Sequence, residues 1–193
     1  MNELDYQRLV IGYHGCDAQT VNDVLLNDQP LKLSENEYDW LGKGIYFWEY
    51  GPQRAEHWAC EEAKRSGKIK TPAVLGAYIH LGNCFDLLDV RNTELLKSLY
   101  PEFVRICAEK KIPLPQNKSP GGSGEDLVLR FRDCAVVNWC LDQLKDTTDY
   151  QTVRCVFSEG SAAFDGSKIL LKSHIQIAVR DPDCIVGFFK PKP

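Results

Sequence analysis

Three apolar runs in the first half of the chain have the length and composition of buried strands. They are RLVIGYHG at residues 8–15, GKGIYFW at residues 42–48 and AVLGAYIHLG at residues 73–82. A shorter run, CFDLLD at residues 84–89, can extend the same sheet. The pattern therefore predicts a sheet built from strands that lie close together in the sequence.

The two segments between these runs have the apolar period of amphipathic helices. Residues 17–28 begin with Asp17, a suitable N-cap, and Pro30 ends that helix. Residues 52–67 begin with Pro52, which is favoured in a first turn, and end at a glycine. We expect a helix in both segments.

The pattern changes in residues 91–145. Residues 92–111 and 125–146 are helical in period, and a Pro/Gly/Ser-rich segment at 112–125 joins them. We expect that joining segment, around SPGGSG, to be a mobile loop. This part of the chain therefore looks like a helical insertion, for which acceptor or partner recognition is the expected role.

Strand-like runs return at the end of the chain, in residues 152–160, 169–181 and 184–189. Strands with interspersed helices, a helical insertion and then clustered strands favour an α+β fold over a regular βαβ array. With 193 residues, the chain is long enough for one domain with a good core, so we expect a single domain over residues 1–193.

The overall charge and the apolar content exclude few classes of function. The formal net charge is −4, which gives no support for a broad phosphate-binding surface, although a local basic patch remains compatible with it. The start of the chain does not resemble a secretory signal, and no segment approaches the length of a membrane span. We expect a cytoplasmic protein with no membrane partner.

The eight cysteines include no C-x-x-C pair and lie mostly in apolar contexts. Their spacing suits neither a zinc site nor a small disulfide scaffold. We expect free, mostly buried thiols in a reducing compartment, and no metal.

His14 stands at the end of the first strand, a costly position for an ionisable group. Its simplest interpretation is a core histidine whose ring nitrogens are satisfied by neighbours. Other reactive side chains follow it, however. Tyr46 lies on a strand bracketed by glycines, Arg54 and His57 lie on the helix after it, and Gln176 lies on a late strand.

This arrangement resembles the ADP-ribosyltransferase superfamily, in its PARP-like and diphtheria-toxin-like branch. That family has His-Gly on its first strand, a Gly-x-Gly-hydrophobic-Tyr-Phe strand before a helix with a second aromatic residue, and a glutamate on a late strand. YHG supplies His14 and Gly15, and GKGIYF supplies Tyr46. His57 stands where the family often has its second tyrosine, and Gln176 in QIAVRDPDCI falls at the glutamate position.

The resemblance implies a split, mainly antiparallel sheet with flanking helices, and NAD+ as co-substrate. Gly15 would let the nicotinamide amide approach the backbone, Tyr46 and His57 would sandwich its ring, and His14 would bind a ribose hydroxyl. Arg54 could contact a phosphate. Each residue also has a purely structural interpretation: a turn for Gly15, the core for Tyr46, and a solvated helix surface for Arg54. Trp58 is expected in the core.

Gln176 departs from the family pattern, because an amide cannot supply the negative charge that stabilises an oxocarbenium-like ribose. This departure puts polymer-forming activity in doubt and favours single transfer. Glu159 is the leading substitute acid, unless it is simply a solvent-facing loop residue. His174 should share the side of the strand with Gln176, where the family can face its acceptor, with Ile175 and Ile177 facing the core.

The resemblance thus implies a mono-ADP-ribosyltransferase that moves ADP-ribose from NAD+ to a macromolecular acceptor, protein or nucleic acid. An NAD+ glycohydrolase, or a catalytically weak NAD+ or ADP-ribose binding module, are the alternatives. Small enzymes of this kind also resemble bacterial toxins and phage-defence effectors, which adds a cognate antitoxin or regulatory protein as a partner.

Overall fold

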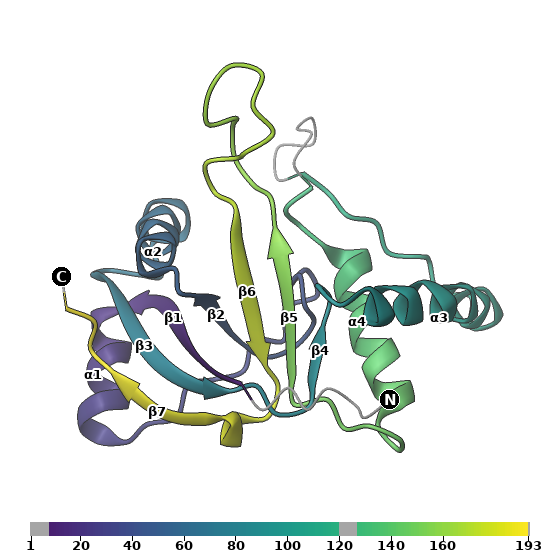
Figure 1. Cartoon of the computed structure of the whole chain (residues 1–193), viewed down its shortest axis with the longest axis horizontal. Helices are drawn as coiled ribbons and strands as arrows, with labels where there is room; N and C mark the ends of the chain where they lie inside the picture. The colour runs from purple at the N-terminus through teal and green to yellow at the C-terminus, as the bar shows by residue number, and fades with distance from the viewer. Residues whose placement is uncertain (1–7, 120–126, 193) are drawn as a thin grey trace.

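The structure, a computed structural model, describes residues 8–119 and 127–192. Within them the chain is α+β, as expected, with seven strands in one mixed sheet of order β4-β5-β6-β2-β1-β3-β7 (Figure 1). Every neighbouring pair is antiparallel except β4 and β5. The strands are β1 (Leu9–Asp17), β2 (Ile45–Glu49), β3 (Pro72–His80), β4 (Cys84–Asp86), β5 (Thr152–Phe157), β6 (His174–Val179) and β7 (Ile185–Phe189).

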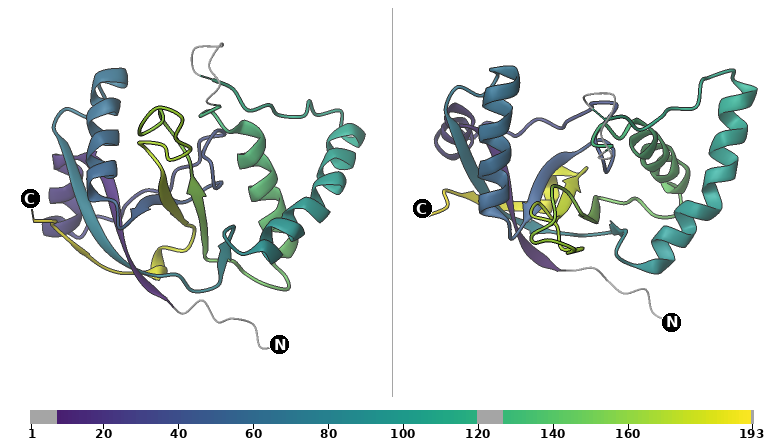
Figure 2. Two further views of the ribbon diagram at one scale, coloured as in Figure 1. Left: turned by 45° about the horizontal axis from the view of Figure 1, so that its top comes forward. Right: turned by 90° about the horizontal axis from the view of Figure 1, so that it is seen from above.

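Four α-helices flank this sheet within the described residues: α1 (Ala18–Asn27), α2 (Pro52–Ser66), α3 (Val90–Glu109) and α4 (Phe131–Leu144). Helices α1 and α2 pack against β1 and β3, whereas α3 and α4 pack against each other beside β4 and β5 (Figure 2). A short 3₁₀ helix, η1 (Pro182–Cys184), leads into β7. Helices α1 and α2 therefore cover one end of the sheet, and α3 and α4 lie at the other end.

Strands β4, β5, β6 and β2 form one part of the sheet, and β1, β3 and β7 form the other. The two parts are joined by a short ladder between β1 and β2. Only two residue pairs, Gly12 with Glu49 and Tyr13 with Trp48, are in register there, whereas β1 and β3 pair over nine residues. Beyond the ladder, the His14 side chain bonds to the β2 backbone, as described below. The junction between the two parts therefore lies beside the histidine whose position was unexplained.

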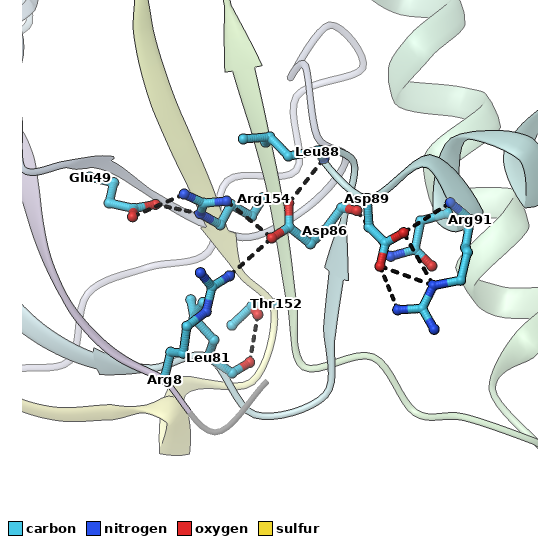
Figure 3. Close-up of polar contacts among 10 residues, drawn as sticks. Arg8, Glu49, Leu81, Asp86, Leu88, Asp89, Arg91, Thr152 and Arg154 are labelled. Atoms are coloured by element: carbon cyan, nitrogen blue, oxygen red, sulfur yellow. Dashed lines mark hydrogen bonds and ion pairs between the residues drawn. The ribbon is translucent and has the colours of Figure 1, made fainter. Parts of the chain in front are cut away.

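Glu49, in the ladder between β1 and β2, belongs to a buried ion-pair network (Figure 3). Arg154 on β5 donates to both carboxylate oxygens of Glu49 on β2, with Nη2 at 3.1 Å from Oε1. Its Nη1 also lies 3.0 Å from Asp86 on β4, which accepts a further bond from Arg8. Arg154 is 7% exposed and Asp86 is 3% exposed, so these charges are largely removed from water. The network links β2, β4 and β5 with the segment that precedes β1.

Most helix boundaries agree with the sequence pattern. Asp17 caps α1 by accepting a bond from Gln19 N at 2.9 Å, and α2 begins at Pro52 and ends with Gly67 in the left-handed conformation. The exception is α4, which begins at Phe131 and not near residue 125.

Both α4 and β6 begin later than expected, at Phe131 and at His174, because an isolated backbone bridge fixes the segment before each of them. Leu129 exchanges backbone hydrogen bonds with Lys118, which keeps the segment before α4 extended. β6 begins at His174 because the preceding residues fold into a loop closed by a bridge between Ala162 and Leu170. Within the joining segment 112–125, the part of SPGGSG from Pro120 onward lies outside the described residues.

All eight cysteines are free thiols, and six of them are buried, as the sequence predicts. Burial raises the pKa of Cys16 and of Cys84 to about 12, so both remain protonated at neutral pH. Among the described residues, no helix is both long enough and apolar enough to cross a membrane.

Candidate functional site

A cavity of about 760 Å³ lies beside the junction of β1 and β2. It is half open and is lined by the ends of these strands, one face of α2, the segment 32–40 and the loop between β5 and β6. All but one of the predicted site residues line it: His14, Gly15, Tyr46, Arg54, Glu159 and Gln176. A smaller hollow of about 350 Å³ beside α4 contains none of them.

His14 is fixed by a bond to the neighbouring strand. Its Nδ1 lies 2.8 Å from the Tyr46 carbonyl oxygen, beyond the last ladder pair. Because a carbonyl oxygen only accepts, Nδ1 carries the proton and donates. Burial lowers the pKa of His14, outweighing the opposite effect of this bond, so the ring is neutral and its Nε2 is a lone-pair acceptor. The cavity therefore contains an oriented acceptor that suits a hydroxyl group.

Tyr46 contributes an aromatic ring and not an acid or base. Its hydroxyl donates to Gly42 O at 2.6 Å and accepts from Leu41 N at 2.9 Å, so both of its functions are used internally. Burial, the largest effect, raises the pKa of the phenol well above its ordinary value. The ring is thus held rigidly at the cavity wall.

Gly15 is required by packing between elements. It lies within β1, opposite Val74 of β3, so it is not a turn residue. A Cβ at Gly15 would lie 2.3 Å from the Ala55 carbonyl oxygen and 3.2 Å from the Trp58 ring. The missing side chain lets the α2 backbone approach β1, which brings the first turns of α2 to the cavity.

The expectation for His57 and Trp58 is reversed in the structure. His57 is exposed and does not line the cavity, whereas Trp58 does, with its ring 5.6 Å from that of Trp48. The reason is the helical period, because Trp58 lies four residues after Arg54 and shares its face, while His57 is turned away. The expectation that His57 lines the same cavity as Tyr46 was wrong.

Arg54 and Glu159 form an ion pair across the cavity wall. Arg54 Nη2 on α2 lies 3.0 Å from Glu159 Oε2 in the β5–β6 loop. The two side chains are 13% and 14% exposed, so neither is the solvated surface residue that the alternatives allowed. Because the Arg54 charge balances the Glu159 carboxylate, Glu159 is not a free negative charge in this state.

Gln176 lies in the middle of β6, paired with Trp48 of β2 and Cys155 of β5. It lines the cavity and is 9% exposed. Ile177 is fully buried on the other face, as expected, and Ile175 is half-buried.

His174 does not reach the cavity as the family pattern suggested. It is not among the residues that line the cavity, and its side chain is 5% exposed. It packs in a cluster of rings instead, with Trp40, Trp48 and Phe157 at centroid distances between 5.8 and 6.3 Å. This aromatic environment explains the burial of His174.

Sequence reasoning missed the aromatic walls of the cavity, formed by Tyr38, Trp40, Trp48 and Trp58. The four-residue spacing of Arg54 and Trp58, with Ala55 and Ala59 facing the sheet, was the signal for one of them. The described residues contain no cluster of three or more His, Cys, Asp or Glu able to hold a metal. Protein-family models and curated proteins were both compared with this chain, and none of them matches it.

Proposed function

We propose that the cavity binds NAD+ and that the protein transfers ADP-ribose from it to a macromolecular acceptor, protein or nucleic acid. One observation carries the proposal. His14, Tyr46 and Gln176, which belong to three strands and span most of the chain, line the same cavity. These residues are the ones on which the resemblance to ADP-ribosyltransferases rests.

The chemistry of each side chain fits this reaction. His14 Nε2 can accept a bond from a ribose hydroxyl, and the fixed Tyr46 ring can stack on the cationic nicotinamide. The bond between the ribose C1′ and the nicotinamide nitrogen breaks, and nicotinamide leaves with the bonding electrons. The acceptor nucleophile then bonds to C1′ and loses its proton to solvent or a base.

Gln176 limits the rate of this reaction in the proposal. Its amide oxygen can accept a hydrogen bond from the ribose, but it adds no negative charge to stabilise the oxocarbenium-like transition state. This chemistry supports a single transfer better than polymer formation. Hydrolysis, in which water is the nucleophile, and binding without turnover are the competing outcomes of the test below.

The test incubates the protein with NAD+ labelled in its adenylate phosphate and a cell lysate, then digests with protease or nuclease separately. Nicotinamide release and transfer of label to a protease- or nuclease-sensitive product are expected. Release without labelling would select hydrolysis, and binding without release would overturn the enzymatic proposal.

Gln176→Ala should lower nicotinamide release by about 10²–10³-fold if its amide acts in the transition state. Gln176→Glu keeps an acceptor and adds charge, so it should preserve or raise release. His80→Ala, on β3 and outside the cavity, is the matched control. Wild-type turnover by Gln176→Ala would remove this residue from the mechanism.

A further inference from the structure

The buried guanidinium of Arg54 has donors without hydrogen-bond acceptors. Only its Nη2 has a partner, Glu159, while Nε and Nη1 are buried and without any partner among the described residues. The Trp48 indole nitrogen is a third such donor, and the Arg54 guanidinium carbon lies 5.6 Å from the centre of the Trp48 ring. Buried donors without partners destabilise a structure, so their clustering at one cavity wall calls for an acceptor.

We infer that Arg54 is a binding residue for a phosphate-type oxyanion, held by Glu159 until the ligand's anionic group displaces that carboxylate. The inference deepens the proposed function, on which the identification of the anion as the NAD+ diphosphate rests. The oxyanion site itself depends only on the unpaired donors and the cavity beside them.

The exchange is favoured by the geometry of the two acceptors. A guanidinium can present two parallel N–H groups to a phosphate, which is a stronger arrangement than a single bond. Glu159 uses one nitrogen of Arg54 and leaves two without acceptors. A phosphate group has enough oxygens to accept from the guanidinium and from the Trp48 indole together.

The exchange does not need the β5–β6 loop to detach from α2. A second ion pair joins the same two elements, with Lys172 Nζ 2.7 Å from Glu61 Oε1. Glu159 can therefore move away from Arg54 while Lys172 keeps the loop against the helix. Both Trp48 and Trp58 line the cavity wall beside Arg54, so their fluorescence should report the exchange.

The experiment measures binding of ADP and of adenosine to the full chain by calorimetry and tryptophan fluorescence. We expect ADP to bind at least tenfold more tightly than adenosine. Arg54→Gln should weaken ADP by tenfold or more and leave adenosine unchanged. Lys64→Gln, which removes an exposed charge on the same helix outside the cavity, should change ADP binding by less than twofold.

Glu159→Gln tests the displaced carboxylate. Because it removes the negative charge that competes for Arg54, it should tighten ADP binding by threefold or more. Unchanged ADP affinity in Arg54→Gln, or weaker ADP binding in Glu159→Gln, would overturn the inference. If Arg54→Gln does not fold, the Arg54→Gln/Glu159→Gln double variant, which buries no unpaired carboxylate, takes its place.

The source of the anion is read from competition with NAD+. ADP that competes with NAD+ supports the diphosphate, whereas Arg54-dependent binding of an oligonucleotide without such competition assigns the phosphate to an acceptor. Arg54-dependent ADP binding without any NAD+ consumption would sink the proposed function alone. NAD+ consumption with ADP binding that ignores Arg54 would sink the oxyanion site alone.

Discussion

Replacement of Gly15 by alanine tests how α2 is held against the sheet. The added Cβ would lie 2.3 Å from the Ala55 carbonyl oxygen, well inside the contact distance of real Cβ atoms. That oxygen belongs to the backbone of α2, so no side-chain rotation can relieve the contact. Ala55 and Ala59 are themselves fully buried against the sheet, so the helix must move as a unit.

The cost of this movement follows from the behaviour of overpacked cores. Inserting a methyl group into a well-packed interface costs about 1–3 kcal/mol. For a chain of this size each kcal/mol lowers the melting temperature by about 2–4 °C. We therefore expect Gly15→Ala to melt roughly 2–12 °C below the wild type. Because α2 carries Arg54 and Trp58, the proposed turnover of NAD+ should fall as well.

The assay is thermal unfolding followed by circular dichroism, with Gly187→Ala as the matched control. Gly187 also lies in a strand of the same sheet, and a Cβ there would meet no atom within 4 Å. Its melting temperature should stay close to that of the wild type. A Gly15→Ala protein that melts with the control would refute the close approach of α2 to β1.

Two further predictions concern buried ionisable groups. Burial lowers the pKa of His14 and of His174 below the ordinary value of 6.5, so below that pH the unfolded chain binds protons that the folded chain does not. Stability should fall as the pH drops from 6.5 toward the folded pKa values, by up to about 1.4 kcal/mol per pH unit for each histidine. His174→Phe should make this dependence shallower, because it removes one of the two groups. An identical pH profile for that variant would contradict the lowered pKa of His174. Arg154→Ala leaves Glu49 buried without its cation and Asp86 with the half-exposed Arg8, and should cost about 3–5 kcal/mol in chemical denaturation. Arg105→Ala removes two exposed ion pairs, with Glu102 and Glu109, and should leave the midpoint nearly unchanged. An Arg154→Ala midpoint equal to that of Arg105→Ala would show that the network contributes nothing.

Local patterns were sufficient to predict β1, β2, β3, α1 and α2. Glycine-bounded apolar runs and the Asp17 and Pro52 signals act over a few residues, so the sequence contains them directly. The start of α4 depends on a backbone pairing between Lys118 and Leu129, across a segment whose composition indicates only a loop. Such pairings leave no periodic trace, so they are visible only in the folded chain.

For the candidate site, the sequence likewise indicated the residues but not their contacts. His14, Tyr46 and Gln176 were identified by a family pattern, but the physical role of Gly15 was not, because its contact partner lies forty residues away at Ala55. The ion pair of Arg54 with Glu159 joins residues 105 positions apart. Sequence reasoning could name both residues as candidates, but only the fold shows that each neutralises the other.

This neutralisation connects the two interpretations of Glu159. While it is paired with Arg54, its carboxylate cannot stabilise positive charge on a ribose. If a diphosphate takes over Arg54, the carboxylate becomes unpaired only when substrate is bound, beside a site where Gln176 supplies no charge. Under that mechanism Glu159→Gln tightens ADP binding and lowers the rate of nicotinamide release. If Glu159 serves only to hold Arg54, the same variant tightens ADP binding and leaves that rate unchanged. Binding and turnover measured on one variant therefore separate a holding role from a role in the transition state.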